Sequence, residues 1–147
     1  MKSMKTTPSG FALLLLVLSL LAVSQTQGQE DVGGKYVGTW RIVSATYGGQ
    51  EFDVSQMGVT LKHVTPTQFT WLSYDKDTGK ISRAGGGKYT LEGTLCKESI
   101  QYGFGDDYEA IKDKVQSLQI KVDGDKLYNK GKLSNGTEIS EVWERVK

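Results

Sequence analysis

The chain has 147 residues, enough for one domain of ordinary size. Its 18 Lys and Arg residues nearly balance its 17 Asp and Glu residues, giving a net charge of +1 with no strongly basic stretch. Nucleic-acid binding normally requires clustered positive charge, so this balance argues against a nucleic-acid partner. The single cysteine, Cys96, excludes an internal disulfide, so the domain must be stabilised by its own core.

The first 28 residues have the pattern of a secretory signal peptide. Lys2 and Lys5 precede an apolar run over residues 11–23, and small residues follow it. The apolar run is shorter than the roughly 20 residues that a membrane-spanning helix needs. A cleaved signal is therefore favoured over a retained N-terminal anchor.

We expect cleavage of this segment after Ser24 or Gly28. A short leader over residues 29–34 then precedes one domain over residues 35–147. Loss of two lysines with the signal changes the net charge from +1 to −1. The expected product is an exported protein, periplasmic or secreted, that keeps no membrane span.

The rest of the chain shows mostly β-strand signals. Apolar residues alternate with polar ones, many glycines punctuate the segments, and prolines are rare. We expect strands over residues 36–46, 58–64, 68–74, 81–83, 88–95, 99–104, 118–122 and 138–146. The glycines at 85–87 predict a flexible break or a β-bulge. Asp123-Gly124 and Asn135-Gly136 predict hairpins, because type I′ turns require positive φ at both central positions.

One segment, residues 107–115, predicts a short helix. Asp106 is placed to cap it, with Glu109 three residues later in a capping-box position. Tyr108, Ile111 and Val115 form one apolar stripe at helical spacing.

This order of elements indicates an all-β fold, an up-and-down antiparallel β-barrel of about eight to ten strands with one short helix. A β-sandwich is the structural alternative. Alternate side chains of a barrel strand face its interior, where they either fill a core or line a pocket. The aromatic and aliphatic residues expected to line the interior are Trp71, Tyr89, Leu91, Tyr102 and Phe104.

The predicted helix could lie across the barrel mouth. In that position Tyr108 and Ile111 would face inward and act as a lid.

Two motifs resemble the calycin group, which includes lipocalins and fatty-acid-binding proteins. Gly38-Thr39-Trp40 lies on the first expected strand, and residues 141–146, Glu-Val-Trp-Glu-Arg-Val, close the last. Residues 63–71 and 86–93 also resemble exported bacterial lipocalin-like proteins of unassigned function. The resemblance implies a lipocalin-like barrel in which Trp40 plugs one end and Arg145 packs across its indole.

The chain also departs from the calycin pattern. The second lipocalin motif, Thr-Asp-Tyr, is absent. The positions of the Arg-x-Tyr pair with which fatty-acid-binding proteins hold a carboxylate are occupied by Glu141 and Trp143. An acid at the first position repels a fatty-acid head group, which argues against fatty-acid binding by that mechanism.

The function predicted from these features is binding of a small apolar or amphipathic ligand inside the barrel. The alternative is a filled barrel that acts as an interaction or inhibitor module for a protein or an envelope component. An enzyme is the least favoured class, because no nucleophile–base pair is visible, and no metal or cofactor is expected. The single histidine, His63, excludes a two-histidine metal site, and alternation with Leu95 suggests that Cys96 points outward.

Overall fold

The computed structural model describes residues 32–147, so the predicted signal peptide, both cleavage sites and residues 29–31 of the leader lie outside it. The strands in this range are β1 (Gly38–Tyr47), β2 (Gln50–Phe52), β3 (Val59–Val64), β4 (Gln68–Tyr74), β5 (Ile81–Glu92), β6 (Leu95–Phe104), β7 (Val115–Asp123), β8 (Lys126–Lys132) and β9 (Glu138–Arg145). The helices are α1 (Val32–Tyr36), the 3₁₀ turn η1 (Val54–Met57) and α2 (Asp106–Ile111).

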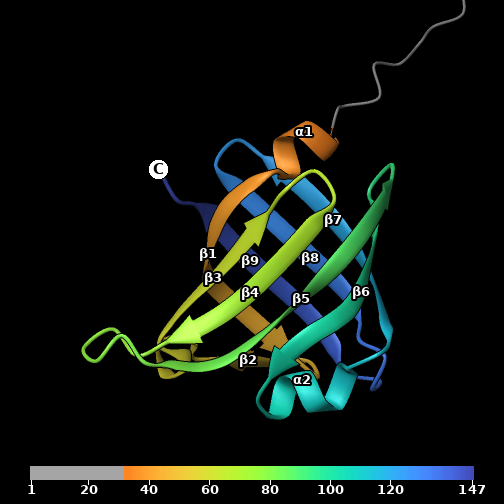
Figure 1. Cartoon of the computed structure of the whole chain (residues 1–147). Coiled ribbons are helices and arrows are strands. Elements are labelled where there is room, and N and C mark those ends of the chain that lie inside the picture. Colours follow the sequence, from red (N-terminus) through yellow and green to blue (C-terminus); the bar gives the residue numbers. More distant parts are fainter. Residues whose placement is uncertain (1–31) are drawn as a thin grey trace, which may run out of the picture.

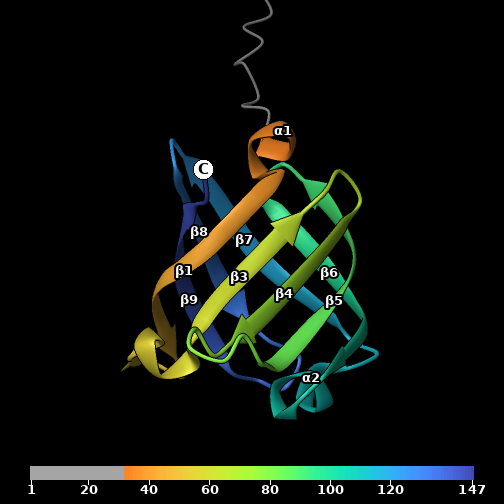
Figure 2. The same ribbon diagram turned by 60° about the vertical axis from the view of Figure 1, so that its left-hand side comes forward.

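Eight of these strands close into a barrel. Within residues 32–147 the strands form one antiparallel sheet in the order β2-β1-β3-β4-β5-β6-β7-β8-β9, and β1 also pairs with β9. The short strand β2 pairs only with β1 and lies outside the ring. The barrel strands follow one another around the ring in chain order (Figures 1 and 2). The predicted up-and-down barrel is therefore confirmed, and the β-sandwich alternative is excluded.

Strand alternation fills the interior of the barrel. In β7 every second residue is buried, from Gln116 through Leu118 and Ile120 to Val122, and the residues between them are exposed. Period-two patterning of this kind turns one set of side chains inward and the other toward solvent.

The two ends of the barrel are occupied by different helices. α1 lies at one end and α2 at the opposite end (Figures 1 and 2). Neither helix, nor any other helix in residues 32–147, combines the length and the apolar character required to cross a bilayer.

The α1 end is closed by the pair that the resemblance predicts. The guanidinium carbon of Arg145 lies 4.1 Å from the ring centre of Trp40, whose indole Nε1 donates to the carbonyl of Tyr36 at 2.9 Å. Gly38 leaves room for this arrangement, because a Cβ there would lie 2.3 Å from Nη1 of Arg145. The φ of Gly38 is also +148°, which residues with a side chain rarely adopt.

The helix α2 is shorter than predicted. It ends at Ile111, and Asp113 follows with a φ of 58°, a left-handed conformation that stops helix propagation. Val115 instead begins β7, where it pairs with Ser99. The N-cap is Gly105 without a side-chain hydrogen bond, so the predicted cap at Asp106 is wrong by one position.

The glycines at 85–87 lie within the continuous strand β5. At this point the pairing between β5 and β6 shifts: Gly86 faces Tyr102, whereas Gly87 faces Ile100. Gln101 is the extra residue on β6, so the irregularity is a bulge rather than a break. The bulge reverses the orientation of the side chains that follow it in β6.

Candidate functional site

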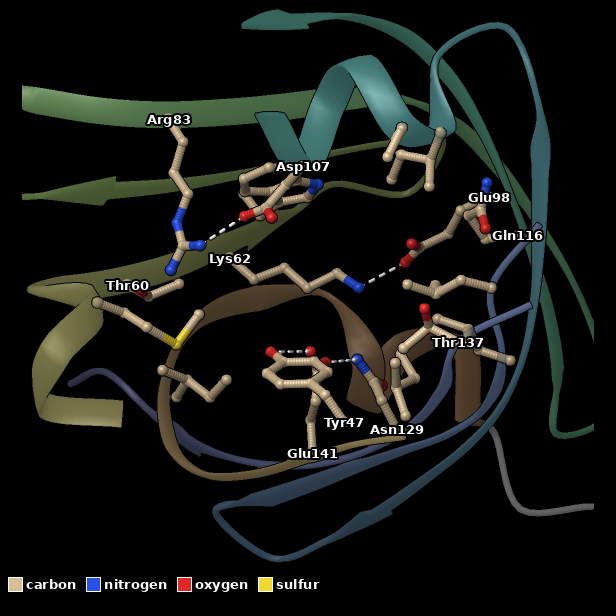
Figure 3. Close-up of a pocket in the computed structure, with 18 of the residues that line it drawn as sticks. Tyr47, Thr60, Lys62, Arg83, Glu98, Asp107, Gln116, Asn129, Thr137 and Glu141 are labelled. Carbon is tan, nitrogen blue, oxygen red and sulfur yellow. Dashed lines mark hydrogen bonds and ion pairs between the residues drawn. The ribbon is translucent and has the colours of Figure 1, made fainter. Parts of the chain in front are cut away.

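A cavity of about 410 Å³ occupies the barrel between the packed α1 end and α2 (Figure 3). Its wall combines apolar side chains with six buried polar residues: Thr60, Lys62, Ser73, Glu98, Gln116 and Asn129. Five exposed residues also line it and form its rim: Phe52, Asp106, Asp107, Ala110 and Asn135. The cavity therefore reaches the surface beside α2, β2 and the β8–β9 loop.

A buried ion pair forms one part of the wall. Nζ of Lys62 on β3 lies 2.5 Å from Oε1 of Glu98 on β6, and the two residues are only 3% and 5% exposed. The hydroxyl of Tyr36 donates to the same carboxylate oxygen at 3.1 Å. Burial alone would lower the pKa of Lys62, but the carboxylate of Glu98 and, more weakly, that of Glu141 raise it above its usual range. Lys62 is therefore held as a cation.

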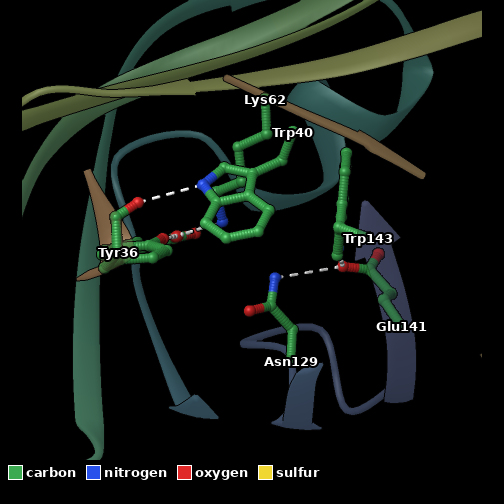
Figure 4. Close-up of polar contacts among 7 residues, drawn as sticks. Tyr36, Trp40, Lys62, Asn129, Glu141 and Trp143 are labelled. Carbon is green, nitrogen blue, oxygen red and sulfur yellow. Dashed lines mark hydrogen bonds and ion pairs between the residues drawn. The ribbon is translucent and has the colours of Figure 1, made fainter. Parts of the chain in front are cut away.

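A second carboxylate, Glu141 on β9, is held by three neutral donors. Its Oε1 accepts from the hydroxyl of Tyr47 at 3.0 Å, and its Oε2 accepts from Nε1 of Trp143 at 3.1 Å and from Nδ2 of Asn129 at 3.3 Å (Figures 3 and 4). Burial and then the charge of Glu141 raise the pKa of Tyr47 far above its usual range, which keeps this hydroxyl protonated as a donor.

Asn129 carries an unsatisfied acceptor. It is 1% exposed and lines the cavity from β8. A carboxylate can only accept hydrogen bonds, so the amide nitrogen of Asn129 must face Glu141 and its carbonyl must face away. Within residues 32–147 this carbonyl oxygen has no hydrogen-bond partner.

The rim is tied to the barrel wall by Arg83 of β5. Its Nη1 lies 2.5 Å from Oδ2 of Asp107 on α2, and its Nε donates to Oγ of Ser73 at 3.1 Å. The hydroxyl of Ser73 also exchanges a 2.7 Å hydrogen bond with Thr60. This chain of contacts fixes α2 against β3, β4 and β5 at the cavity mouth.

The predicted interior residues occupy three different places. Trp71 lines the cavity. Tyr89 and Leu91 are half-buried and pack on the core, where the Tyr89 ring meets Tyr36 edge-on at 5.3 Å; they are not among the cavity-lining residues.

Tyr102 and Phe104 lie on the outside of the barrel. They are 44% and 47% exposed, and Tyr102 bonds through its hydroxyl to Thr70 and to the carbonyl of Phe69. The prediction that both rings face the interior is therefore wrong. Strict alternation from Ile100 would turn both rings inward, but the bulge at Gln101 reverses the orientation of the residues that follow it.

The two predicted lid residues lie on α2 at the mouth. Ile111 is 7% exposed and lines the cavity, whereas Tyr108 is half-buried and packs on the core without lining it.

His63 and Cys96 lie in different environments. His63 is exposed on β3, where Nδ1 shares a 3.0 Å hydrogen bond with the hydroxyl of Thr39. Cys96 is fully buried, which corrects the expected outward orientation. Burial, and then the charge of Glu98, raises the pKa of its thiol to about 12. The thiol is therefore protonated at neutral pH, which makes it a poor nucleophile.

Sequence reasoning missed the polar groups of the cavity. Lys62, Glu98, Gln116 and Asn129 all occupy inward positions of their strands and are at most 5% exposed. A usable signal was present, since each stands in phase with apolar neighbours that the same strand buries. A polar residue at such a position marks either a satisfied core group or a site.

The chain matches no protein-family model and no curated protein sequence. Its fold is nevertheless similar to that of solved structures. A lipocalin-like protein from Bacteroides uniformis is 15% identical, with a TM-score of 0.57 over 77% of this chain and 100% of that one. An uncharacterized protein from Bacteroides eggerthii is 14% identical, with a TM-score of 0.52 over 76% and 99% of the two chains. A redesigned β-barrel is 17% identical, with a TM-score of 0.50 over 78% and 95%.

At these identities the similarity concerns the fold. Together with the closed sheet and the Trp40–Arg145 contact, it shows that this chain folds as a lipocalin-like β-barrel.

Proposed function

We propose that the protein binds a small amphipathic molecule inside the barrel. The observation that carries this proposal is the open cavity of about 410 Å³. Pockets for small organic ligands typically have volumes of about 300–1,000 Å³ and combine apolar walls with a few converging polar groups. A barrel filled by its own side chains, as the alternative interaction module requires, would lack such a space.

The walls match an amphipathic ligand better than a wholly apolar one. Apolar surface is supplied by Ile42, Trp71, Ile100, Leu118 and Ile139. Burying about 200 Å² of apolar ligand surface there contributes roughly 5 kcal/mol before the entropic cost of association. The buried carboxylates and amides along the same wall would orient a polar head.

A titration with a fluorescent apolar probe tests this proposal. We expect saturable binding with a shift in tryptophan emission, because Trp71 and Trp143 line the cavity. Ala110→Trp, at the exposed rim, should block the mouth and weaken binding about tenfold or more. Glu109→Trp, on the neighbouring exposed residue that does not line the cavity, is the matched control. Absence of saturable binding by a protein with a normal β-sheet circular dichroism spectrum would refute the proposal.

We further propose that the protein is exported after cleavage of residues 1–28 or 1–24 and that it has no enzymatic activity. The basic-apolar-small pattern of the N-terminus supports export. The buried, protonated thiol of Cys96 and the separate position of His63 support a binding role. The mass of the protein isolated from its host's envelope and medium tests the first point, since an intact N-terminus would contradict it.

A further inference from the structure

The cavity has an excess of negative charge. Its lining contains two cations, Lys62 and Arg83, and four acids, Glu98, Glu141, Asp106 and Asp107. With all six groups ionised the lining carries a net charge of −2. A low-dielectric cleft with a net charge of one sign concentrates ligands of the opposite sign.

Both cations of the lining are already paired. Lys62 lies 2.5 Å from Glu98, and Arg83 lies 2.5 Å from Asp107. Within residues 32–147, Glu141 has no Lys or Arg within 4.0 Å and is held by the neutral donors Tyr47, Asn129 and Trp143. Three hydrogen bonds stabilise a carboxylate but do not cancel its charge. The deep group formed by Lys62, Glu98 and Glu141 therefore has a formal charge of −1.

Asn129 supplies a second, independent sign of a missing donor. Its carbonyl oxygen is buried, faces away from Glu141 and accepts no hydrogen bond from the described chain (Figure 4). Buried acceptors are normally satisfied, by protein, by water or by a ligand. A ligand N–H beside Glu141 would supply this missing donor only after the Asn129 side chain shifts, because the oxygen has almost no accessible surface in this structure.

We propose that the cavity takes an organic cation, a primary ammonium group attached to an apolar body, with Glu141 as its counter-ion. This inference rests on the proposed binding function and names the class of ligand. The ammonium lies beside Glu141 and Asn129, and the apolar body lies against Trp71, Leu118 and Ile139. A carboxylate ligand with the same apolar body binds less well, because it would add a third negative charge beside Glu98 and Glu141.

Three ligands of equal chain length test the charge preference directly. 1-Octylamine, 1-octanol and octanoate are titrated into the protein at pH 7, with tryptophan emission and calorimetry as readouts. The amine is protonated at this pH. We expect octylammonium to bind about tenfold more tightly than octanol, since hydrogen bonds to a charged group are stronger, and octanoate to bind most weakly.

The variant Glu141→Gln removes the charge and keeps the size of the side chain. It should reduce the preference for octylammonium over octanol to about twofold or less. Glu138→Gln, an exposed residue of the same strand that does not line the cavity, should leave the preference unchanged. If Glu141→Gln does not fold, Asp106→Asn at the exposed rim should lower the preference in the same direction.

The outcomes separate the two proposals. Equal binding of octylamine and octanol, or tighter binding of octanoate, overturns the cation inference and leaves the proposed function standing. No saturable binding of any of the three ligands or of the apolar probe overturns the proposed function itself. An amine preference that survives Glu141→Gln in a folded protein overturns the assignment of Glu141 as the counter-ion.

Discussion

Removing the Arg145 side chain should destabilise the barrel without impairing its cavity. Nη1 of Arg145 donates to the carbonyl of Val37 at 3.0 Å, and Nη2 donates to that of Lys35 at 2.6 Å. The guanidinium also covers the Trp40 ring at 4.1 Å. Arg145→Ala removes all three contacts from the α1 end, whereas the cavity opens at the other end.

The expected decrease in the free energy of unfolding follows from those contacts. Hydrogen bonds from a charged donor contribute about 1.5–3 kcal/mol each, and the lower figure applies to a side chain that is 26% exposed. The contact between cation and ring adds about 1 kcal/mol. The sum, about 4 kcal/mol, is a large fraction of the roughly 5–15 kcal/mol by which domains are stable. With a urea dependence of about 2 kcal/mol per molar, the midpoint should fall by about 2 M.

Urea unfolding followed by tryptophan emission measures this change. Arg41→Ala is the matched control, because Arg41 is 58% exposed and lies 3.7 Å from Glu144 in a surface ion pair worth at most about 1 kcal/mol. Equal midpoints for the two variants would refute the role of Arg145 in closing the barrel. Loss of octylammonium binding by folded Arg145→Ala would refute the separation of the closed end from the cavity.

Three further changes have defined outcomes. Lys62→Met leaves the Glu98 carboxylate buried without its cation, so the free energy of unfolding should fall by about 3–5 kcal/mol, measured in urea. Lys121→Met, 69% exposed, should change it by less than about 0.5 kcal/mol, and equal effects would contradict the reasoning. Gly38→Ala should lower the midpoint in the same direction as Arg145→Ala, because the added Cβ displaces the guanidinium; an unchanged midpoint would contradict this. Burial raises the pKa of Cys96 from 9.0 to about 12, so the native thiol keeps a proton that the unfolded chain loses. The contribution of this thiol to the free energy of unfolding is fully present below pH 9. Above pH 9 that free energy falls by about 1.4 kcal/mol per pH unit. Wild type should therefore lose stability more steeply than Cys96→Ala between pH 9 and 10, and parallel curves would show that the thiol does not contribute.

The barrel itself could be predicted from the sequence, because hairpin turns and period-two alternation are local signals. The β8–β9 loop contains Asn135-Gly136 as expected, whereas the β7–β8 turn falls on Gly124 and Asp125, one residue later than predicted. The three-residue strand β2 was missed, since it is too short to show alternation. No strand was expected where β8 (Lys126–Lys132) lies, and the strand expected over residues 88–95 runs across the turn that separates β5 from β6. Short-range patterns therefore predict the other strands to within a few residues, but not β2, β8, the β5–β6 turn or the end of the helix.

The cavity could not be predicted in the same way, because its contacts join distant strands. Alternation with Cys96 and Ile100 places Glu98 on the inward face, but it does not identify the partner, because Lys62 lies 36 residues away. Alternation predicts an interior position for Tyr102 and Phe104. The prediction fails because one unpaired residue, Gln101, shifts the alternation of β6, and no feature of the sequence marks that bulge. Trp71 was placed correctly at the wall, since no bulge separates it from the buried Phe69 on β4.

The absence of a side chain at Gly85 has a consequence for the shape of the cavity. A Cβ on Gly85 would lie 2.6 Å from Cζ2 of Trp71, so the indole rests directly against the main chain of β5. Any larger residue at position 85 must push the indole, and Trp71 is part of the cavity wall. The shape of the cavity wall therefore depends on a residue that is not itself among those lining the cavity. Under the proposed function, a substitution at this one position would change the space for a ligand without replacing any polar residue of the cavity lining.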